Sequence, residues 1–120
     1  MATGTTATGA GVWRATPAGG LVDSRGAFLD MLGEAVGAGA EALVVPVERL
    51  SPRFFELSTG LAGEVAQAAV NYGRRLVILG DGSAVCERSR AFRDWVRECG
   101  RSRHIAFVPD EAGLSAALER

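Results

Sequence analysis

Hydrophobic residues follow two patterns along this chain, short continuous runs and helical repeats, and the two alternate from residue 11 onwards. Residues 42–47, 75–80 and 104–108 are apolar runs of strand length, as expected for strands buried on both faces of a sheet. Residues 11–16 alternate and predict a first strand, and Leu21 with Val22 predicts a short returning strand after the turn at residues 17–20. Pro46 indicates either a sheet edge or the end of its strand.

Four helices are predicted between and after these strands. The first is capped by Asp23 or Ser24 and ends at Gly37 and Gly39, and the second runs from about Thr59 to Tyr72. The third spans residues 87–99, and the fourth starts at Pro109 and Asp110. The residues that form their apolar faces are Ala27, Phe28, Met31, Leu32, Ala35 and Val36; Leu61, Ala62, Val65, Ala68, Ala69 and Tyr72; Phe92, Trp95, Val96 and Cys99; and Leu114, Ala117 and Leu118.

Strands that alternate with helices predict an α/β fold, here one domain over residues 11–120. We expect a mixed, mostly parallel sheet of four or five strands, with about four helices packed largely on one face. Residues 1–10 contain mainly Thr, Gly and Ala and are expected to form a flexible tail.

Composition narrows the functional classes. The net charge of −1 argues against nucleic acid as a partner, and no apolar run reaches the ~20 residues of a membrane helix. With no leader pattern at the N-terminus, we expect a cytoplasmic protein without a membrane partner. All 13 basic residues are arginine, which together with abundant Ala and Gly is typical of a high-GC bacterium, such as an actinobacterium.

The most informative stretch is residues 54–64, where an apolar segment turns into a helix beside two hydroxyl residues, Ser58 and Thr59. The first turn of a helix has unpaired N–H groups and partial positive charge. Ser58 or Thr59 could therefore be a simple N-cap, a contact for a ligand phosphate or partner, or a site of phosphorylation. There is no capping box, because Ala62 stands three residues after Thr59. Gly60 permits close approach but also fits close helix packing.

A second candidate segment is residues 80–83, Gly-Asp-Gly-Ser, at the carboxyl end of a predicted parallel strand. Open α/β sheets commonly bind ligands at this edge. The segment is not a dinucleotide fingerprint, because Val85 stands where a third glycine is needed, and it is not a Walker loop. A turn explains it equally well, and Asp81 alone is a weak acid–base candidate.

The remaining chemistry-bearing residues have simpler explanations. Arg90, Arg93, Arg97 and Arg101 share one helix face, which predicts a solvated surface or a patch for an acidic partner. Cys86 and Cys99 have no metal-ligand spacing and are expected to be free thiols, Cys99 within the core and Cys86 a minor nucleophile candidate. For His104, the sequence pattern indicates no carboxylate partner. We expect no metal and no cofactor.

The segment FFELSTGLAGEVAQAAVNYGRRLVILGD, residues 54–81, closely resembles the bacterial domain-of-unknown-function 4180 family. The hallmarks of that family are a phenylalanine-rich turn, a Thr-Gly-Leu-Ala-Gly-Glu motif, a helix that ends Asn-Tyr and a strand that ends Gly-Asp. Residues 89–108 fit the same pattern, so the resemblance covers about residues 11–119. It implies no defined activity.

Residues 57–61 also resemble the Asp-Ser-Ser-Gly-Leu motif of STAS domains, the fold of anti-anti-sigma factors. The serine that is phosphorylated in those domains matches Ser58, but Leu57 replaces the aspartate before it. The likeness therefore favours a STAS-like fold more than it favours phospho-regulation.

Two functional hypotheses follow. The first is a non-catalytic regulatory or interaction module that contacts a protein partner through residues 54–63, at Ser58 or Thr59. The second is a small-molecule binder, or a cofactor-independent enzyme of a biosynthetic pathway, with its pocket between Ser58 and Asp81 and flanked by Phe54, Phe55 and Tyr72. A homodimer through the edge near Pro46 or through the first hairpin would be compatible with either.

Overall fold

The structure, a computed structural model, describes residues 4–7, 11–16, 19–81, 87, 89–99 and 104–118. Five strands form one sheet in the order β1-β2-β3-β4-β5. Strands β2 to β5 run parallel to one another, whereas β1 pairs antiparallel with β2. The sheet confirms the predicted α/β class. The strands are β1 (Gly4–Ala7), β2 (Val12–Ala15), β3 (Ala42–Pro46), β4 (Arg75–Leu79) and β5 (Ile105–Val108).

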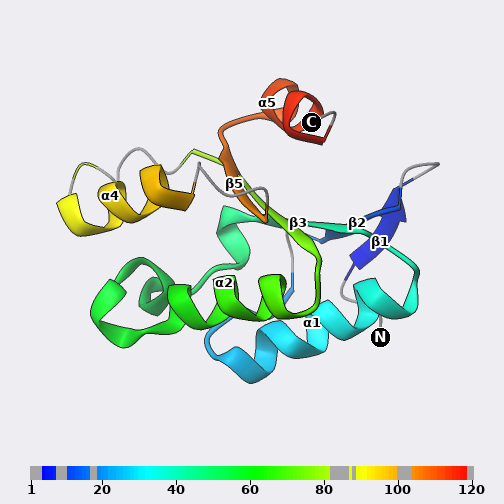
Figure 1. Ribbon diagram of the computed structural model, residues 1–120, viewed down its shortest axis with the longest axis horizontal. Helices are drawn as coiled ribbons and strands as arrows, with labels where there is room; N and C mark the ends of the chain where they lie inside the picture. The colour runs from blue at the N-terminus through cyan, green and yellow to red at the C-terminus, as the bar shows by residue number, and fades with distance from the viewer. Residues whose placement is uncertain are drawn as a thin grey trace.

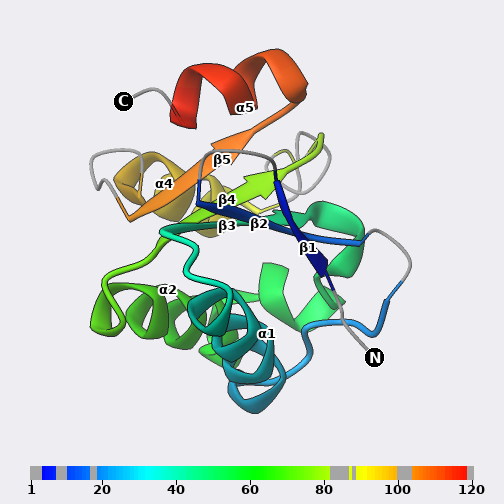
Figure 2. The same cartoon turned by 90° about the vertical axis from the view of Figure 1, so that its right-hand side faces the viewer.

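The helices occupy both faces of this sheet unequally (Figures 1 and 2). Because β2 to β5 follow one another in chain order and parallel crossovers are right-handed, the three crossover helices must lie on the same face. Among the helices of the described residues, α5, which follows the last strand, is the one that covers the opposite face. The prediction of helices largely on one face is therefore confirmed. The helices are α1 (Arg25–Gly37), α2 (Leu61–Asn71), α4 (Arg90–Cys99) and α5 (Glu111–Leu118), with short 3-10 helices η1 (Val47–Arg49), η2 (Pro52–Phe55) and η3 (Leu57–Thr59).

Alternation along the strands divides the core into two layers. Leu43 and Val45 point to the face of α1, α2 and α4, whereas Val44 between them points to the face of α5. All five residues of β3 are buried, as expected for a central strand in an all-apolar run. The larger layer contains Phe28, Phe54 and Phe92, each nearly inaccessible to solvent. The chain therefore builds most of its core under the three crossover helices.

Side-chain caps begin α1 and α5 where the sequence predicts them. Ser24 Oγ accepts a hydrogen bond from the Ala27 N–H at 3.1 Å, which selects Ser24 over Asp23 as the cap. Asp110 Oδ1 accepts from the Gly113 N–H at 2.8 Å. At its other end, α1 finishes at Gly37, as predicted.

Several sequence-based expectations are corrected by the fold. Residues 1–10 are not a flexible tail throughout, because Gly4–Ala7 pairs with β2 and satisfies the backbone groups at the edge of that strand. Of the two alternatives for Pro46, the structure shows the end of a strand and not a sheet edge, since Pro46 ends β3, the middle strand of the sheet. Tyr72 does not belong to the buried face of the second helix, since 53% of it is exposed. Val22 forms a single parallel bridge with Leu50 rather than a returning strand.

Candidate functional site

The segment before α2 is a tight turn built from η2 and η3, anchored in the core by Phe54. The Phe54 ring is 1% exposed and makes edge-to-face contacts with Phe55, Phe92 and Trp95 at centroid distances of 5.5, 6.3 and 6.1 Å. Backbone hydrogen bonds close both short helices, for example from the Gly60 N–H to the Leu57 carbonyl at 3.0 Å. The turn is therefore held in one conformation by the core below it.

Thr59 and Ser58 have different roles in this turn. The Thr59 hydroxyl donates towards the carbonyl oxygens of Arg53 and Glu56, which lie 2.7 and 2.8 Å from its Oγ1. The same oxygen accepts a hydrogen bond from the Leu61 N–H at 3.3 Å. Ser58 is exposed, and its hydroxyl makes no hydrogen bond within the described part of the chain. Thr59 is thus used to close the turn, whereas Ser58 is presented to solvent.

Neither hydroxyl residue occupies the N-cap position of α2, contrary to the simplest sequence interpretation. Gly60 occupies it instead, with a left-handed φ of 79° and no side-chain cap. Any β-carbon is strained in that conformation, which explains the glycine directly. The helix consequently starts at Leu61, two residues later than predicted.

Gly80 and Asp81 lie at the carboxyl end of β4, at the same edge of the sheet as the start of α2. Gly80 has a φ of 142° and packs against the side chain of Val47, where a β-carbon would clash. Its N–H donates to the Val108 carbonyl at 2.9 Å. Gly80 is therefore required for backbone geometry, and Asp81 follows it as an exposed residue. Gly82 and Ser83 lie outside the described residues.

A pocket of about 250 Å³, which we call the aromatic pocket, opens at this edge between α4 and the ends of β4 and β5. Of the predicted ligand-site residues, the structure brings Phe55 and Asp81 together there. Phe54 lies buried behind it, and Ser58 does not line it. Tyr72 caps the far end of α2, towards the opposite edge of the sheet. These five candidates therefore lie in three places, the turn, the aromatic pocket and the far end of α2, rather than in one pocket.

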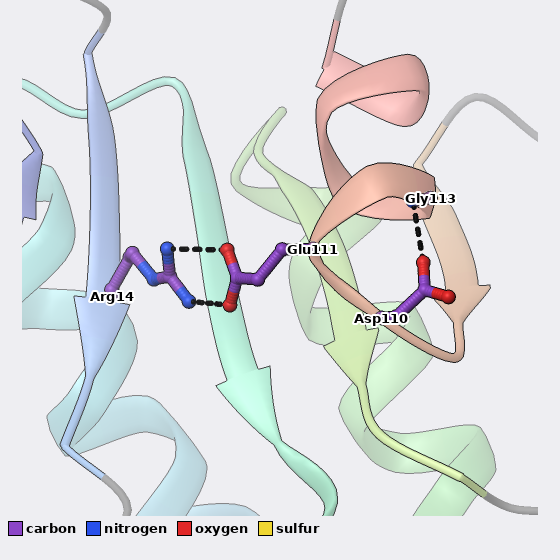
Figure 3. Close-up of polar contacts among 4 residues, drawn as sticks. All are labelled: Arg14, Asp110, Glu111 and Gly113. Carbon is purple, nitrogen blue, oxygen red and sulfur yellow. Dashed lines mark hydrogen bonds and ion pairs between the residues drawn. The ribbon is translucent and has the colours of Figure 1, made fainter.

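A second, larger hollow, which no sequence pattern predicts, lies at the carboxyl ends of the strands on the α5 face. It measures about 580 Å³ and includes Thr16, Glu48 and Asp110. It is lined by a bidentate ion pair between Arg14 of β2 and Glu111 of α5, in which Nη1 donates to Oε1 at 3.1 Å and Nη2 to Oε2 at 2.7 Å (Figure 3). This pair raises the pKa of Arg14 and lowers that of Glu111, chiefly through the hydrogen bonds. It connects α5 to a strand 97 residues earlier in the chain.

Replacing Glu111 with glutamine is expected to lower the free energy of unfolding by at most about 1 kcal/mol, because both side chains are well exposed. Since folding lowers the Glu111 pKa, the contribution is complete above the ordinary pKa of about 4.3 and is lost as the pH falls through the folded-state value. Urea unfolding of wild type, Glu111→Gln, Arg14→Gln and the double variant, at neutral and acid pH, measures this coupling. A coupling energy of the same size at both pH values would contradict the assignment.

Arg49 is a further residue that no sequence pattern indicates. Its guanidinium group is buried, with 3% of the residue exposed, and it donates to the carbonyl oxygens of Gly20 and Thr16 at 2.7 and 2.8 Å. These bonds tie the segment after β2 to η1. Arg49 therefore positions the carboxyl edge of the sheet from inside.

The other predicted candidates lie apart from this edge. Arg90, Arg93 and Arg97 are exposed on α4, as the spacing predicts, while Arg101 lies outside the described residues. Cys99 ends α4 and is half-buried; burial, and then the Glu98 charge, raise the pKa of its thiol and keep it protonated at neutral pH. His104 precedes β5 at the amino edge, opposite Ser58 and Asp81. Cys86 lies outside the described residues.

Two general features are absent from the described residues. They contain no group of three or more His, Cys, Asp or Glu side chains placed to hold a metal ion. Among their helices, none has the length and apolar character needed to span a membrane.

Comparison with known proteins gives a family but no activity. Neither the curated proteins nor the solved structures include a match to this chain. A family model described as Domain of unknown function (DUF4180) matches residues 8–118, which include all the described elements from β2 to α5. The chain therefore belongs to the DUF4180 family.

Proposed function

We propose that this protein is an interaction module that contacts a protein partner through residues 54–63, with Ser58 at the centre of the contact. The observation that carries the proposal is the difference in hydrogen bonding and exposure between the Thr59 and Ser58 hydroxyl groups. The Thr59 hydroxyl forms hydrogen bonds inside the turn, whereas Ser58 is exposed on a backbone segment that packs against the core.

Rigidity is the physical basis for this choice of surface. Binding through a flexible loop loses conformational entropy, whereas a turn already held in its bound shape avoids much of that loss. The Phe54 ring, the backbone bonds of η2 and η3, and a bond from Arg53 to the Asp23 carbonyl at 2.9 Å all restrain this turn. The exposed residues Glu56, Ser58 and Gly60 are therefore displayed in a constant arrangement.

The resemblance of residues 57–61 to the STAS motif supports a regulatory form of the same proposal. A phosphate on Ser58 would add negative charge close to the N-terminus of α2, which starts three residues later at Leu61. Because Leu57 replaces the aspartate of the STAS motif, the proposal requires either a kinase of different specificity or a contact through unmodified Ser58.

Affinity capture from cells that naturally express the protein tests the proposal. Wild type is compared with Ser58→Ala and Ser58→Glu, and Ser115→Ala and Ser115→Glu are matched controls, since Ser115 is an exposed serine on α5. We expect a partner whose recovery changes at least tenfold in one of the Ser58 variants and in neither Ser115 variant. Identical partner sets for all five proteins would overturn the proposal.

A further inference from the structure

The aromatic pocket is a second, separate place where the fold leaves apolar surface open. Its principal walls come from η1 and η2, the end of β4, α4 and the end of β5, which are separated along the sequence. Ser58 does not line it, so it is distinct from the turn proposed above. The side chains that define it are Val47, Phe55, Ile78, Phe92, Val96 and Phe107.

The packing of α4 explains why this space is not filled. Phe92 is the one residue of that helix that is buried, while Trp95 and Val96 are half-buried. The rings of Phe55 and Phe107 stand edge-on to Phe92, at 5.4 and 6.2 Å between centroids, and both remain partly exposed. The resulting hollow of about 250 Å³ is partly open to solvent, so these rings leave apolar surface that a ligand can cover.

The chemistry of the walls defines what the pocket would accept. A water molecule needs polar partners, and these walls are mostly apolar, so the space favours an apolar guest. Aromatic rings offer edge-to-face contacts to another planar ring. A dry cavity of about 150 Å³ lined by Leu, Ile and Phe is enough for benzene, so this pocket has room for one or two rings. Among the described residues that line it, Asp81 alone is charged, so they offer no cation to an anionic guest, and the desolvation of such a guest would oppose its binding.

We propose that the aromatic pocket binds a small, uncharged, planar aromatic molecule of one or two rings. Such a ligand would lie against Phe55 and Phe107 and under Val96, with its edge towards Asp81. Its affinity would come from buried apolar area and ring contacts rather than from charge.

Titration of ¹⁵N-labelled full-length protein with indole, followed by amide chemical shifts, tests this proposal. We expect saturable shifts at Gly80, Asp81 and Val96, with a dissociation constant on the order of 0.1–1 mM, as suits a ligand of this size. Indole-3-carboxylate, which carries the same rings and a negative charge, is expected to bind at least threefold more weakly.

Filling the pocket provides the decisive variants. Val96→Phe and Val96→Trp are expected to weaken indole binding at least tenfold, while Val70→Trp, at an exposed position on α2, leaves it unchanged. Dispersed amide spectra and thermal melting confirm that each variant is folded. Absence of saturable shifts in wild type, or equal binding by wild type and a folded Val96 variant, would overturn the proposal.

Discussion

Replacing Phe92 with alanine is expected to lower the free energy of unfolding by about 3–5 kcal/mol. Its ring is 2% exposed and contacts four other aromatic rings, those of Phe54, Phe55, Trp95 and Phe107. It is also the one buried residue of α4, so its loss removes the main attachment of that helix to the sheet. Urea unfolding followed by far-UV circular dichroism measures the change.

The matched control for this prediction is Phe92→Leu, which keeps most of the apolar volume and is expected to cost about 1–2 kcal/mol. A second control, Val70→Ala, changes an exposed residue and is expected to cost less than about 1 kcal/mol. A loss below about 1 kcal/mol for Phe92→Ala would mean that α4 does not depend on this ring.

Replacing Gly80 with alanine is the second change of large expected effect, at about 3 kcal/mol. Two costs combine, because an L-residue is strained at a φ of 142° and the new methyl group would clash with the side chain of Val47. The β4 strand ends here, so the strain falls on the edge that carries both the aromatic pocket and Asp81. Thermal and urea unfolding give the magnitude.

Two comparisons separate these costs. The double variant Gly80→Ala with Val47→Ala removes the clash but not the backbone strain. We expect its free energy of unfolding to fall by less than the sum of the decreases measured for the two single variants. Gly63→Ala adds a methyl group inside α2 where no atom lies within 4 Å, and is expected to stabilise the protein by about 0.5–1 kcal/mol. Equal effects for Gly80→Ala and Gly63→Ala would contradict the close packing at Gly80.

The parts of the fold that sequence predicted correctly are those whose signal is local. The central strands β3 and β4 are continuous apolar runs, and α1 has a regular apolar face. The burial of each of these elements can therefore be predicted from its own residues. β1 escaped prediction because its Gly-Thr-Thr-Ala segment has no apolar alternation, and its pairing depends on the free edge of β2. The start of α2 was misplaced because Gly60, rather than a hydroxyl side chain, occupies the cap.

The site was harder to predict because its parts come together only in the folded chain. Thr59 and Ser58 are neighbours with similar chemistry, and only the position of the Arg53 and Glu56 carbonyls determines which hydroxyl is occupied. The aromatic pocket combines Phe55 with rings from α4 and β5, and the Arg14–Glu111 pair joins the two ends of the domain. Contacts of this kind leave no periodic signal in a single sequence.

Site-specific photo-crosslinking tests the central claim most directly, which is that Ser58 lies at a contact surface. A photoreactive phenylalanine analogue is placed at position 58, and at position 115 as the control, in cells that naturally express the protein. The account predicts a discrete crosslinked partner from position 58 that is absent from position 115. The same crosslinks from both positions, or none from position 58, would contradict it.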